Sequence, residues 1–275
     1  MNFRPVRISV VIPAYNEASR IAGPIRRIAS YLAAREETCE LIVVDDGSRD
    51  GTADVLCEIA SELPVRCRVL RYPDNRGKGH ALKIGFAHAT GECILFSDAD
   101  LSTPIEEFDR LYERIEQGHD VAIGSRKMSG AEVTIRQPFV RERLGKVFTW
   151  LSNLLIAEVS DVTCGFKLYR GAVGRDLFGH ARIENWSFDA EILFLARLRG
   201  HRLAEVPVHW HDEPGTKVSL LRDGVRAGFD LLRIRWIGFR GHYARPVESD
   251  ARVEELALPR SPDLDAPPSS AAART

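Results

Sequence analysis

The sequence predicts an α/β protein with a mostly parallel, doubly wound sheet and helices on both of its faces. Two observations support this prediction. Short apolar runs alternate with helix-like segments four times within about the first 100 residues, as expected of repeated βαβ units. The runs at 8–13 and 41–44 are rich in Val and Ile and almost wholly apolar, which is typical of strands buried on both faces of a sheet.

The first half of the chain supplies five strands and the helices between them. Apolar residues recur at helical spacing at Ile21, Ile25, Ile28 and Leu32, and Thr52 can cap the second helix. We expect strands at residues 8–13, 41–44, 68–71, 93–96 and 121–126, and helices at 19–35, 52–63, 81–88 and from 104 onward.

The second half of the chain is richer in helical and cationic sequence. Pro207 favours a strand at the edge of the sheet. The apolar stripe at 148–156 fits either the core or a helix at a membrane interface, and we favour the interface; the segment at 217–240 has the same two interpretations. We expect a helix at 141–157, a turn and short strand at 161–169, a helix at 189–199, an edge strand at 204–210 and a basic amphipathic segment at 217–243.

The composition excludes some classes of protein. A net charge of -1 over 275 residues gives no reason to expect nucleic-acid binding. The five cysteines form no CxxC pair, so we expect them to be reduced and buried. No apolar stretch reaches the ~20 residues of a membrane-spanning helix. The N-terminus has no signal-peptide core, so the cytosol is the default location.

Acidic side chains follow three of the predicted strands. Glu17 follows the first, Asp45 and Asp46 end the second, and Asp98 and Asp100 follow the fourth. Ligands of such sheets bind at the carboxyl ends of the strands. Residues two apart in an extended segment point the same way, so the last pair can hold one hard cation, Mg²⁺ or Mn²⁺.

Several polar residues also have simpler structural interpretations. Asp45 could cap the turn that follows it, and Glu17 could cap the first helix. His209 and His211 with Asp212 could form a metal site, although their alternation on an exposed edge strand is the better explanation. The cations at 141–146 form either a solvated helix face or a contact with an acceptor or a membrane, and we favour the contact.

Six short motifs resemble those of the family 2 glycosyltransferases, which have the GT-A fold. Their order and spacing, over about residues 8–236, are specific for that fold and for nucleotide-sugar use, although each one alone is a weak signal. Within the family the chain most resembles the polyprenyl- (dolichyl-) phosphate hexosyltransferases, in particular the dolichyl-phosphate β-glucosyltransferase branch. The motifs are VIPAYNE at 11–17, VVDDGSRDGT at 43–52, NRGKG at 75–79, DADLS at 98–102, GSR at 124–126 and CGFK at 164–167.

The resemblance implies a nucleotide-sugar site at the strand ends. Asp98 and Asp100 would hold Mg²⁺ or Mn²⁺ on the donor diphosphate, which neutralises charge on the leaving group. Some relatives have a third metal-facing side chain two residues later; here that residue is Ser102, so water is expected to substitute. The residues implied for the nucleotide-sugar pocket are Pro13, Tyr15, Glu17, Asp46, Lys78 and Asp98.

The implied acceptor is a phosphate monoester, which is ionised near neutral pH and needs positioning more than deprotonation. Arg126, Arg141 and Lys217 would bind that phosphate, since Arg can grip phosphate with two N–H groups. Asp189 matches an acidic position that other family 2 enzymes use as a base or as an active-site organiser, and both roles remain open. The catalytic residues implied are Asp98, Asp100, Asp189 and Arg126.

The implied organisation is one GT-A domain at 1–243 with a nucleotide-binding half at about 6–125. The acceptor half at about 126–243 would contain amphipathic interfacial helices. The tail at 244–275 is first acidic and then rich in Ala, Pro and Ser, which predicts disorder.

These expectations describe an inverting, metal-dependent enzyme that transfers a hexose to a polyprenyl phosphate at the cytoplasmic membrane face. UDP-glucose is the first-choice donor. With no spanning helix expected, membrane contact would be peripheral or supplied by a membrane-anchored partner. The alternatives are GDP-mannose as donor, a saccharide or small-molecule hydroxyl as acceptor, and a non-catalytic nucleotide-sugar-binding module.

Overall fold

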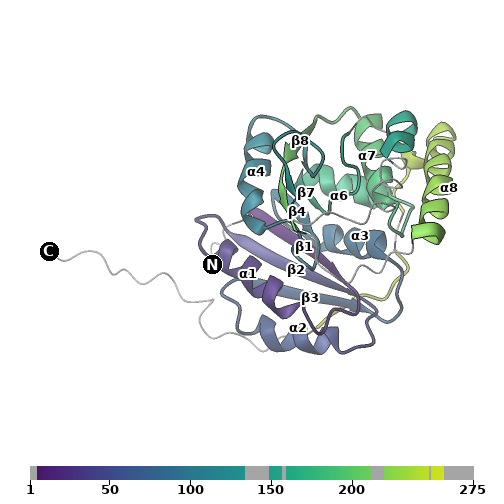
Figure 1. Ribbon diagram of the computed structural model, residues 1–275. Coiled ribbons are helices and arrows are strands. Elements are labelled where there is room, and N and C mark those ends of the chain that lie inside the picture. The colour runs from purple at the N-terminus through teal and green to yellow at the C-terminus, as the bar shows by residue number, and fades with distance from the viewer. Residues whose placement is uncertain (1–4, 134–148, 157–158, 212–219, 248, 257–275) are drawn as a thin grey trace.

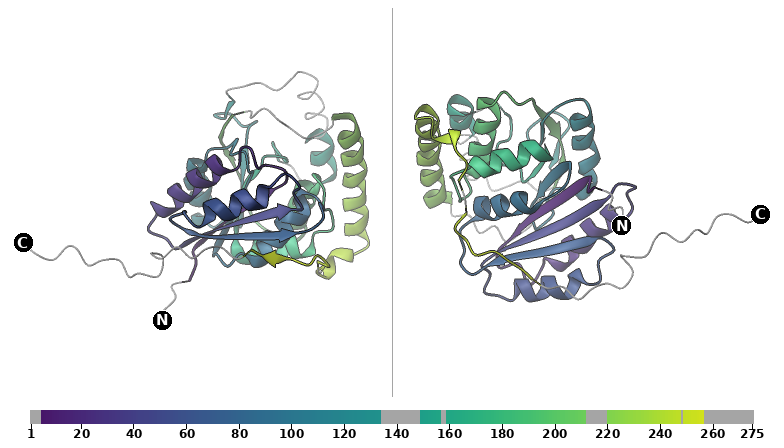
Figure 2. Two further views of the ribbon diagram at one scale, coloured as in Figure 1. Left: turned by 90° about the horizontal axis from the view of Figure 1, so that it is seen from below. Right: turned by 180° about the vertical axis from the view of Figure 1, so that it is seen from behind.

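The computed structural model describes residues 5–133, 149–156, 159–211, 220–247 and 249–256. One large sheet lies between two layers of helices (Figures 1 and 2). Its strands are β1 (Ile8–Ala14), β2 (Cys39–Asp46), β3 (Arg66–Tyr72), β4 (Cys93–Ser97), β5 (Val121–Ser125), β7 (Phe166–Arg170), β8 (Leu203–Pro207) and β10 (Glu254–Glu255). A separate pair is formed by β6 (Glu132–Val133) and β9 (His209–Trp210).

The strand order in the large sheet is β10-β3-β2-β1-β4-β7-β5-β8. The strands β1 to β4 are parallel, and β5 and β8 are parallel to each other. The strand β7 runs antiparallel to both of its neighbours, β4 and β5. The predicted mostly parallel α/β sheet is therefore confirmed, and β7, from the second half of the chain, lies between two strands of the first half.

Helices cover both faces of the sheet. The face that α1, α2 and α4 cover has a core built on Ile25, Leu56 and Phe108, and the opposite core includes Phe86 and Phe178. Both cores exclude water from the sheet, which is the main source of stability in such a layered fold. The helices are α1 (Ala22–Ala33), α2 (Thr52–Ala60), α3 (Lys78–His88), η1 (Ile105–Glu107), α4 (Phe108–Glu116), α6 (Gly171–His180), α7 (Phe188–Leu198), α8 (Leu220–Phe239) and η2 (His242–Ala244).

The two amphipathic segments have apolar side chains on two sides. In the helical residues 149–155, Leu151 and Leu155 pack against the core while Trp150 and Leu154 are exposed. Among the described side chains of α8, the buried apolar ones are Leu231, Ile234 and Ile237, and the exposed apolar ones are Phe229, Leu232, Trp236 and Phe239. The core interpretation is confirmed for one side of each helix, and the interface interpretation of the exposed apolar side stays a prediction. In the described part of the chain, no helix combines the length and the apolar character needed to cross a membrane.

The prediction that disorder begins at 244 is wrong for the described residues up to 256. The backbone N–H of Val247 donates to the carbonyl oxygen of Gly179 at 2.8 Å, and β10 pairs antiparallel with β3. Arg68 holds Glu255 with two hydrogen bonds of 2.9 and 2.8 Å. Composition predicted disorder because the segment has few apolar residues; strand pairing and ion pairs with distant residues order it instead.

Candidate active site

The predicted site lies at the edge of the sheet where β1, β2 and β4 end. These strands are parallel neighbours, with Ala14 of β1 opposite Asp45 of β2. Pro13 lies near the end of β1 and Tyr15 directly follows the strand; both are half-buried. The loops after the three strands therefore leave the sheet side by side, as expected for a ligand site in a parallel sheet.

Asp98 is the first residue after β4, and the backbone before β7 fixes its position. Its N–H donates to the carbonyl oxygen of Gly165 at 3.1 Å. A Cβ atom on Gly165 would lie 1.9 Å from Oδ2 of Asp98. The Asp98 carboxylate can keep its place only if residue 165 is glycine. The glycine of the CGFK motif thus shapes the site by leaving space for it.

Lys78, the first residue of α3, forms an ion pair with Asp98. Its Nζ lies 2.5 Å from Oδ1 of Asp98, and 4.8 and 5.0 Å from the ring centroids of Phe96 and Trp186. Burial lowers the pKa of Lys78, but the carboxylates of Asp98 and Asp189 raise it by more. Lys78 is therefore a fixed positive charge at the centre of the site. Trp186, which the sequence did not mark, adds a half-exposed aromatic wall.

Asp100 is the second carboxylate of the pair. Its Oδ1 accepts the N–H of Ser102 at 3.0 Å. Burial raises the pKa of Asp100, and the negative charge of Asp98 raises it further, so the two carboxylates lie close enough to repel each other. A divalent cation would relieve that repulsion.

The donor set of this pair fits Mg²⁺ or Mn²⁺ bound together with a diphosphate. Nowhere in the described ranges do three or more His, Cys, Asp or Glu side chains gather around one point. A cation at Asp98 and Asp100 would take its other oxygen ligands from water and phosphate, as Mg²⁺ commonly does.

Asp189 belongs to the same cluster. It lies in the first turn of α7 and is buried against Lys167, whose ammonium also donates to the carbonyl oxygen of Cys164 at 2.7 Å. Burial raises the pKa of Asp189, and the cations Lys167 and Lys78 offset only part of that effect. Sequence reasoning missed Lys167. A lysine within the apolar run of β7 was the available signal, since a buried ammonium needs a partner.

Asp46 anchors the loop that leads into α3. Its carboxylate accepts hydrogen bonds from the hydroxyl of Tyr72 and the side-chain amide of Asn75, both at 2.7 Å. It also accepts the backbone N–H groups of Arg76 at 2.8 Å and Gly77 at 2.9 Å. Burial raises the pKa of Asp46 despite these donors. The residue expected to contact the base or ribose thus also positions the loop that presents Lys78.

The simpler interpretation of Asp45 is confirmed, because its carboxylate accepts the N–H of Ser48 at 3.1 Å and so caps the turn after β2. Glu17 has a local structural function as well. Its N–H donates to Oγ1 of Thr52 at 2.8 Å, and its carboxylate pairs with Arg20 one turn later. Both acidic residues stabilise the loops at the edge of the sheet.

Arg126 does not present a free guanidinium to a phosphate. Its Nε and Nη2 donate to the two carboxylate oxygens of Asp161 at 2.6 and 2.8 Å, and Nη2 also reaches Oγ1 of Thr163 at 3.0 Å. Burial disfavours the charge of Arg126, but Asp161 outweighs it and raises the pKa of Arg126. Arg126 thus makes with Asp161 the two parallel hydrogen bonds that were expected with a phosphate. Arg141 and Lys217, the other predicted acceptor residues, lie outside the described residues.

His209, in β9, has two carboxylate neighbours. Nδ1 of His209 pairs with Glu107, and its Nε2 lies 3.5 Å from Glu132. These contacts join β9 to η1 and β6. They account for His209 without a metal, in agreement with the edge-strand interpretation; Asp212 lies outside the described residues.

The chain is similar in sequence to glycosyltransferases that act on dolichyl phosphate. The chain is 36% identical over 265 residues to a dolichyl-phosphate β-glucosyltransferase of Trichomonas vaginalis, covering 92% of this chain and 78% of the relative. It is 34% identical to the dolichyl-phosphate β-glucosyltransferase of Saccharomyces cerevisiae, covering 86% of this chain and 76% of that protein.

A similar solved structure is glucosyl-3-phosphoglycerate synthase from Mycobacterium tuberculosis with Mn²⁺, UDP-glucose and phosphoglyceric acid. It superposes with a TM-score of 0.61 at 19% identity, covering 92% of this chain and 88% of that one, and so supports the fold. A sequence profile described as Glycosyl transferase family 2 matches residues 9–178. The predicted family is therefore confirmed, and the chain belongs to glycosyl transferase family 2.

Proposed function

We propose that this glycosyltransferase moves glucose from UDP-glucose to a polyprenyl phosphate of the dolichyl type, with inversion at the anomeric carbon. The observation that carries the proposal is the cluster of Asp98, Asp100, Lys78 and Asp189 at the carboxyl edge of the sheet. The relatives named as dolichyl-phosphate β-glucosyltransferases support the sugar and the acceptor.

The donor would bind across the ends of β1, β2 and β4. Pro13, Tyr15 and Glu17 would line the nucleotide pocket beside Asp46. Asp98 and Asp100 would hold Mg²⁺ or Mn²⁺, which when bound neutralises charge on the departing diphosphate. The mycobacterial glucosyl-3-phosphoglycerate synthase, solved with Mn²⁺ and UDP-glucose, supports this choice of donor and metal.

The chain's own residues would orient and screen the two phosphate-bearing substrates. Lys78 is held by Asp98 and flanked by aromatic rings, so its charge is in place before the donor arrives. Asp189, paired with Lys167, would organise the cluster, because an ionised phosphate acceptor has no proton to give up. Arg126 would act through Asp161 by positioning the loop before Gly165, and Arg141 and Lys217 would supply the acceptor's phosphate contacts.

The reaction would take place at the cytoplasmic face of a membrane, where a polyprenyl phosphate presents its headgroup. Peripheral contact through the exposed apolar residues of α8, or a membrane-anchored partner, would bring the protein there. GDP-mannose as the donor and a water-soluble hydroxyl as the acceptor are the competing possibilities.

The test is a transfer assay with defined donors and acceptors. The protein is incubated with UDP-glucose or GDP-mannose, Mg²⁺ or Mn²⁺, and a short polyprenyl phosphate, and the lipid product is identified by mass. We expect a glucosylated lipid from UDP-glucose, its loss with EDTA, and its recovery with either metal. Product only on a water-soluble acceptor, or only from GDP-mannose, would overturn the corresponding part of the proposal.

Substitutions at the pair of aspartates sharpen this test. Asp98→Asn and Asp100→Asn should each lower kcat by at least about 100-fold, since each removes a charged ligand of the diphosphate site. Asp54→Asn is the matched control, because Asp54 is an exposed carboxylate in the first turn of α2 that is not part of the cluster, and the substitution should leave the rate unchanged.

Asp189→Asn separates a phosphate acceptor from a hydroxyl acceptor. If Asp189 only organises the cluster, its amide variant should lose about 10- to 100-fold in rate, with no change in the pH profile of kcat between pH 6 and 8. A complete loss of activity, or a pH profile that loses one limb, would identify Asp189 as a general base and favour a hydroxyl acceptor.

A further inference from the structure

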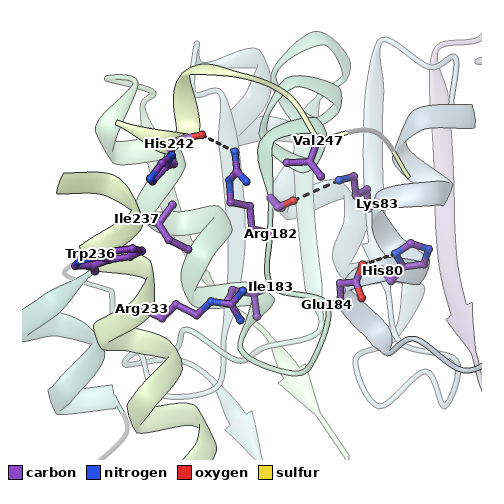
Figure 3. A pocket seen from close by; sticks show the side chains of 12 residues that line it. His80, Lys83, Arg182, Ile183, Glu184, Arg233, Trp236, Ile237, His242 and Val247 are labelled. Atoms are coloured by element: carbon purple, nitrogen blue, oxygen red, sulfur yellow. Dashed lines mark hydrogen bonds and ion pairs between the residues drawn. The ribbon is translucent and has the colours of Figure 1, made fainter. Parts of the chain in front are cut away.

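A cavity of about 390 Å³ lies apart from the aspartate cluster, between α3, the segment 181–184 and α8. Figure 3 shows three elements contributing to it: Lys83 from α3, Arg182 from the connecting segment, and Arg233 from α8. Lys83 and Arg233 both reach toward that segment from opposite sides. The volume falls in the range of small-molecule sites.

Among the described residues none of the three cations of this cavity forms an ion pair, although the carboxylate of Glu184 also lines it. Lys83 makes only a long contact of 3.4 Å with the carbonyl oxygen of Ala181, and Nη2 of Arg182 donates to the carbonyl oxygen of His242 at 2.6 Å. Nε of Arg182 is buried without a hydrogen-bond acceptor. This N–H has no exposed surface, so a ligand in the cavity would meet the other donors of Arg182 together with Lys83 and Arg233, which also line it.

The nearby carboxylates are occupied elsewhere. Glu184 accepts from Arg76 at 2.9 Å and contacts Nδ1 of His80 at 3.0 Å. Glu191 is fully buried, and its oxygens accept two backbone N–H groups and the hydroxyl of Tyr243. Burial lowers the pKa of Lys83 and outweighs the carboxylates of Glu184 and Glu191, which raise it, and the positive charges of Arg182 and Arg76 lower it further. The two carboxylates therefore compensate the cations only in part.

We propose that this cavity binds a phosphate group, held by Lys83, Arg182 and Arg233. Phosphate offers three or more acceptor oxygens in different directions, which suits donors that come from three separate elements. Trp236 and Ile237 form an apolar wall on the α8 side, and Trp236 is 54% exposed. That wall can cover the apolar part of a phosphate ester. The site is additional to the donor cluster and does not depend on the proposed transfer reaction.

The phosphate could come from two sources, an anionic lipid headgroup or a soluble phosphate compound. Trp236 is one of several exposed apolar residues of α8, which would suit a lipid whose headgroup enters the cavity. Two probes distinguish the sources: pyrophosphate in solution, and phosphatidylcholine vesicles with or without phosphatidic acid.

The first measurement is titration calorimetry with pyrophosphate in EDTA at physiological salt, so that metal-dependent binding at Asp98 and Asp100 contributes nothing. Arg233→Gln and Lys83→Gln should each weaken binding at least about 10-fold, the loss expected for one charge-assisted contact. Arg226→Gln is the matched control, since Arg226 is an exposed arginine of the same helix that does not line the cavity.

The second measurement is cosedimentation of the full chain and the same variants with the two kinds of vesicle. Phosphatidic-acid-dependent binding that Arg233→Gln removes and Arg226→Gln retains would identify a lipid headgroup; the same pattern with pyrophosphate would identify a soluble phosphate. The proposal is overturned if neither probe binds. It is also overturned if Arg226→Gln and Arg233→Gln weaken binding equally, because that result would mean a diffuse charge effect.

Discussion

The carboxylate of Asp98 lies against Gly165, and no side chain fits between them. A glycine without a side chain can therefore decide where the carboxylate proposed to bind the metal lies. The added methyl group of alanine would meet the end of the Asp98 side chain, which can rotate away, and not a backbone atom. The expected consequence is a displaced carboxylate in an otherwise intact fold.

We predict that Gly165→Ala lowers kcat by about 100-fold or more, because small displacements of a positioned group are costly to catalysis. The melting temperature should change by only a few degrees, measured by calorimetry alongside the transfer assay. Gly23→Ala is the control, since an added Cβ there meets nothing within 4 Å and the residue is helical. Wild-type activity in Gly165→Ala would contradict this account of the site.

Asp161 is a second residue whose importance is structural. Its carboxylate is fully buried and holds Arg126 by two side-chain hydrogen bonds. Burial alone would raise the pKa of Asp161, but the Arg126 charge lowers it well below the ordinary value. An acid with a depressed folded-state pKa stabilises the fold above its unfolded pKa of about 3.9, and that contribution disappears as the pH falls toward the folded value.

We predict that Asp161→Asn lowers the free energy of unfolding by about 3–5 kcal/mol at pH 7, because it leaves a buried guanidinium without its counter-charge. Urea unfolding at several pH values should show the difference from wild type shrinking below about pH 4. Glu106→Gln, which breaks the exposed pair with Arg27, should cost less than about 1 kcal/mol. Equal effects of the two substitutions would refute the distinction.

For single residues, the sequence predicted those that belong to recognisable patterns. It did not predict the roles of residues that depend on a partner far away in the chain. Asp98 and Asp100 were predicted from a motif and Asp189 from an acidic position shared with other family 2 enzymes, and the structure gathers them with Lys78. Lys167 was not predicted, since its partner Asp189 is 22 residues away on another element. Arg126 was assigned to an acceptor because nothing local reveals Asp161, 35 residues later, as its counter-charge.

At the scale of the elements, the conformation of the loop between β3 and α3 depends on the side chain of Asp46. Asp46 accepts hydrogen bonds from four different residues of β3 and this loop, and Gly77 allows the close approach of the loop to residue 184. The φ angle of Gly77 is 109°, a value that other residues rarely adopt. The loop therefore delivers Lys78 to the site in a defined position.

We predict that Asp46→Ala lowers the free energy of unfolding by about 2–4 kcal/mol and raises KM for the nucleotide sugar, because it leaves several donors unsatisfied. Tyr72→Phe removes one of the same hydrogen bonds and should cost only about 1 kcal/mol, with KM nearly unchanged. Chemical denaturation and donor kinetics measure the two effects. A larger change in KM for Tyr72→Phe than for Asp46→Ala would contradict this assignment.

Helices and strands were predicted correctly where apolar residues are periodic. They were missed where tertiary contacts determine the structure. The β-branched runs became β1 and β2, and the apolar spacing of α1 and α4 is present. The helix α6 was missed because Gly171, Gly174 and Gly179 reduce its helix propensity; Gly174 packs against Phe86, which explains why glycine is tolerated there. The antiparallel placement of β7 could not be predicted, since register and strand order are set by long-range pairing.

At the scale of the whole molecule, the two predicted halves share one sheet. The strand β7 lies between β4 and β5, so the segment that carries Gly165 and Lys167 is built into the half predicted to bind the nucleotide. Asp189 enters from α7 on one face, and Lys78 from α3 on the same face. The site is therefore assembled by the complete sheet, and we expect neither half to bind a nucleotide sugar when produced alone.

The short strand β10 has a consequence for solubility. An unpaired edge strand exposes N–H and carbonyl groups that can pair with another chain and start aggregation. The strand β3 would be such an edge, but β10 covers it with two exposed glutamates, one of them held by Arg68. A chain ending at Val247 should thus aggregate over hours at 37 °C and scatter light, while the full chain stays clear. A strand of two residues, β10, would then be enough to prevent self-association through β3.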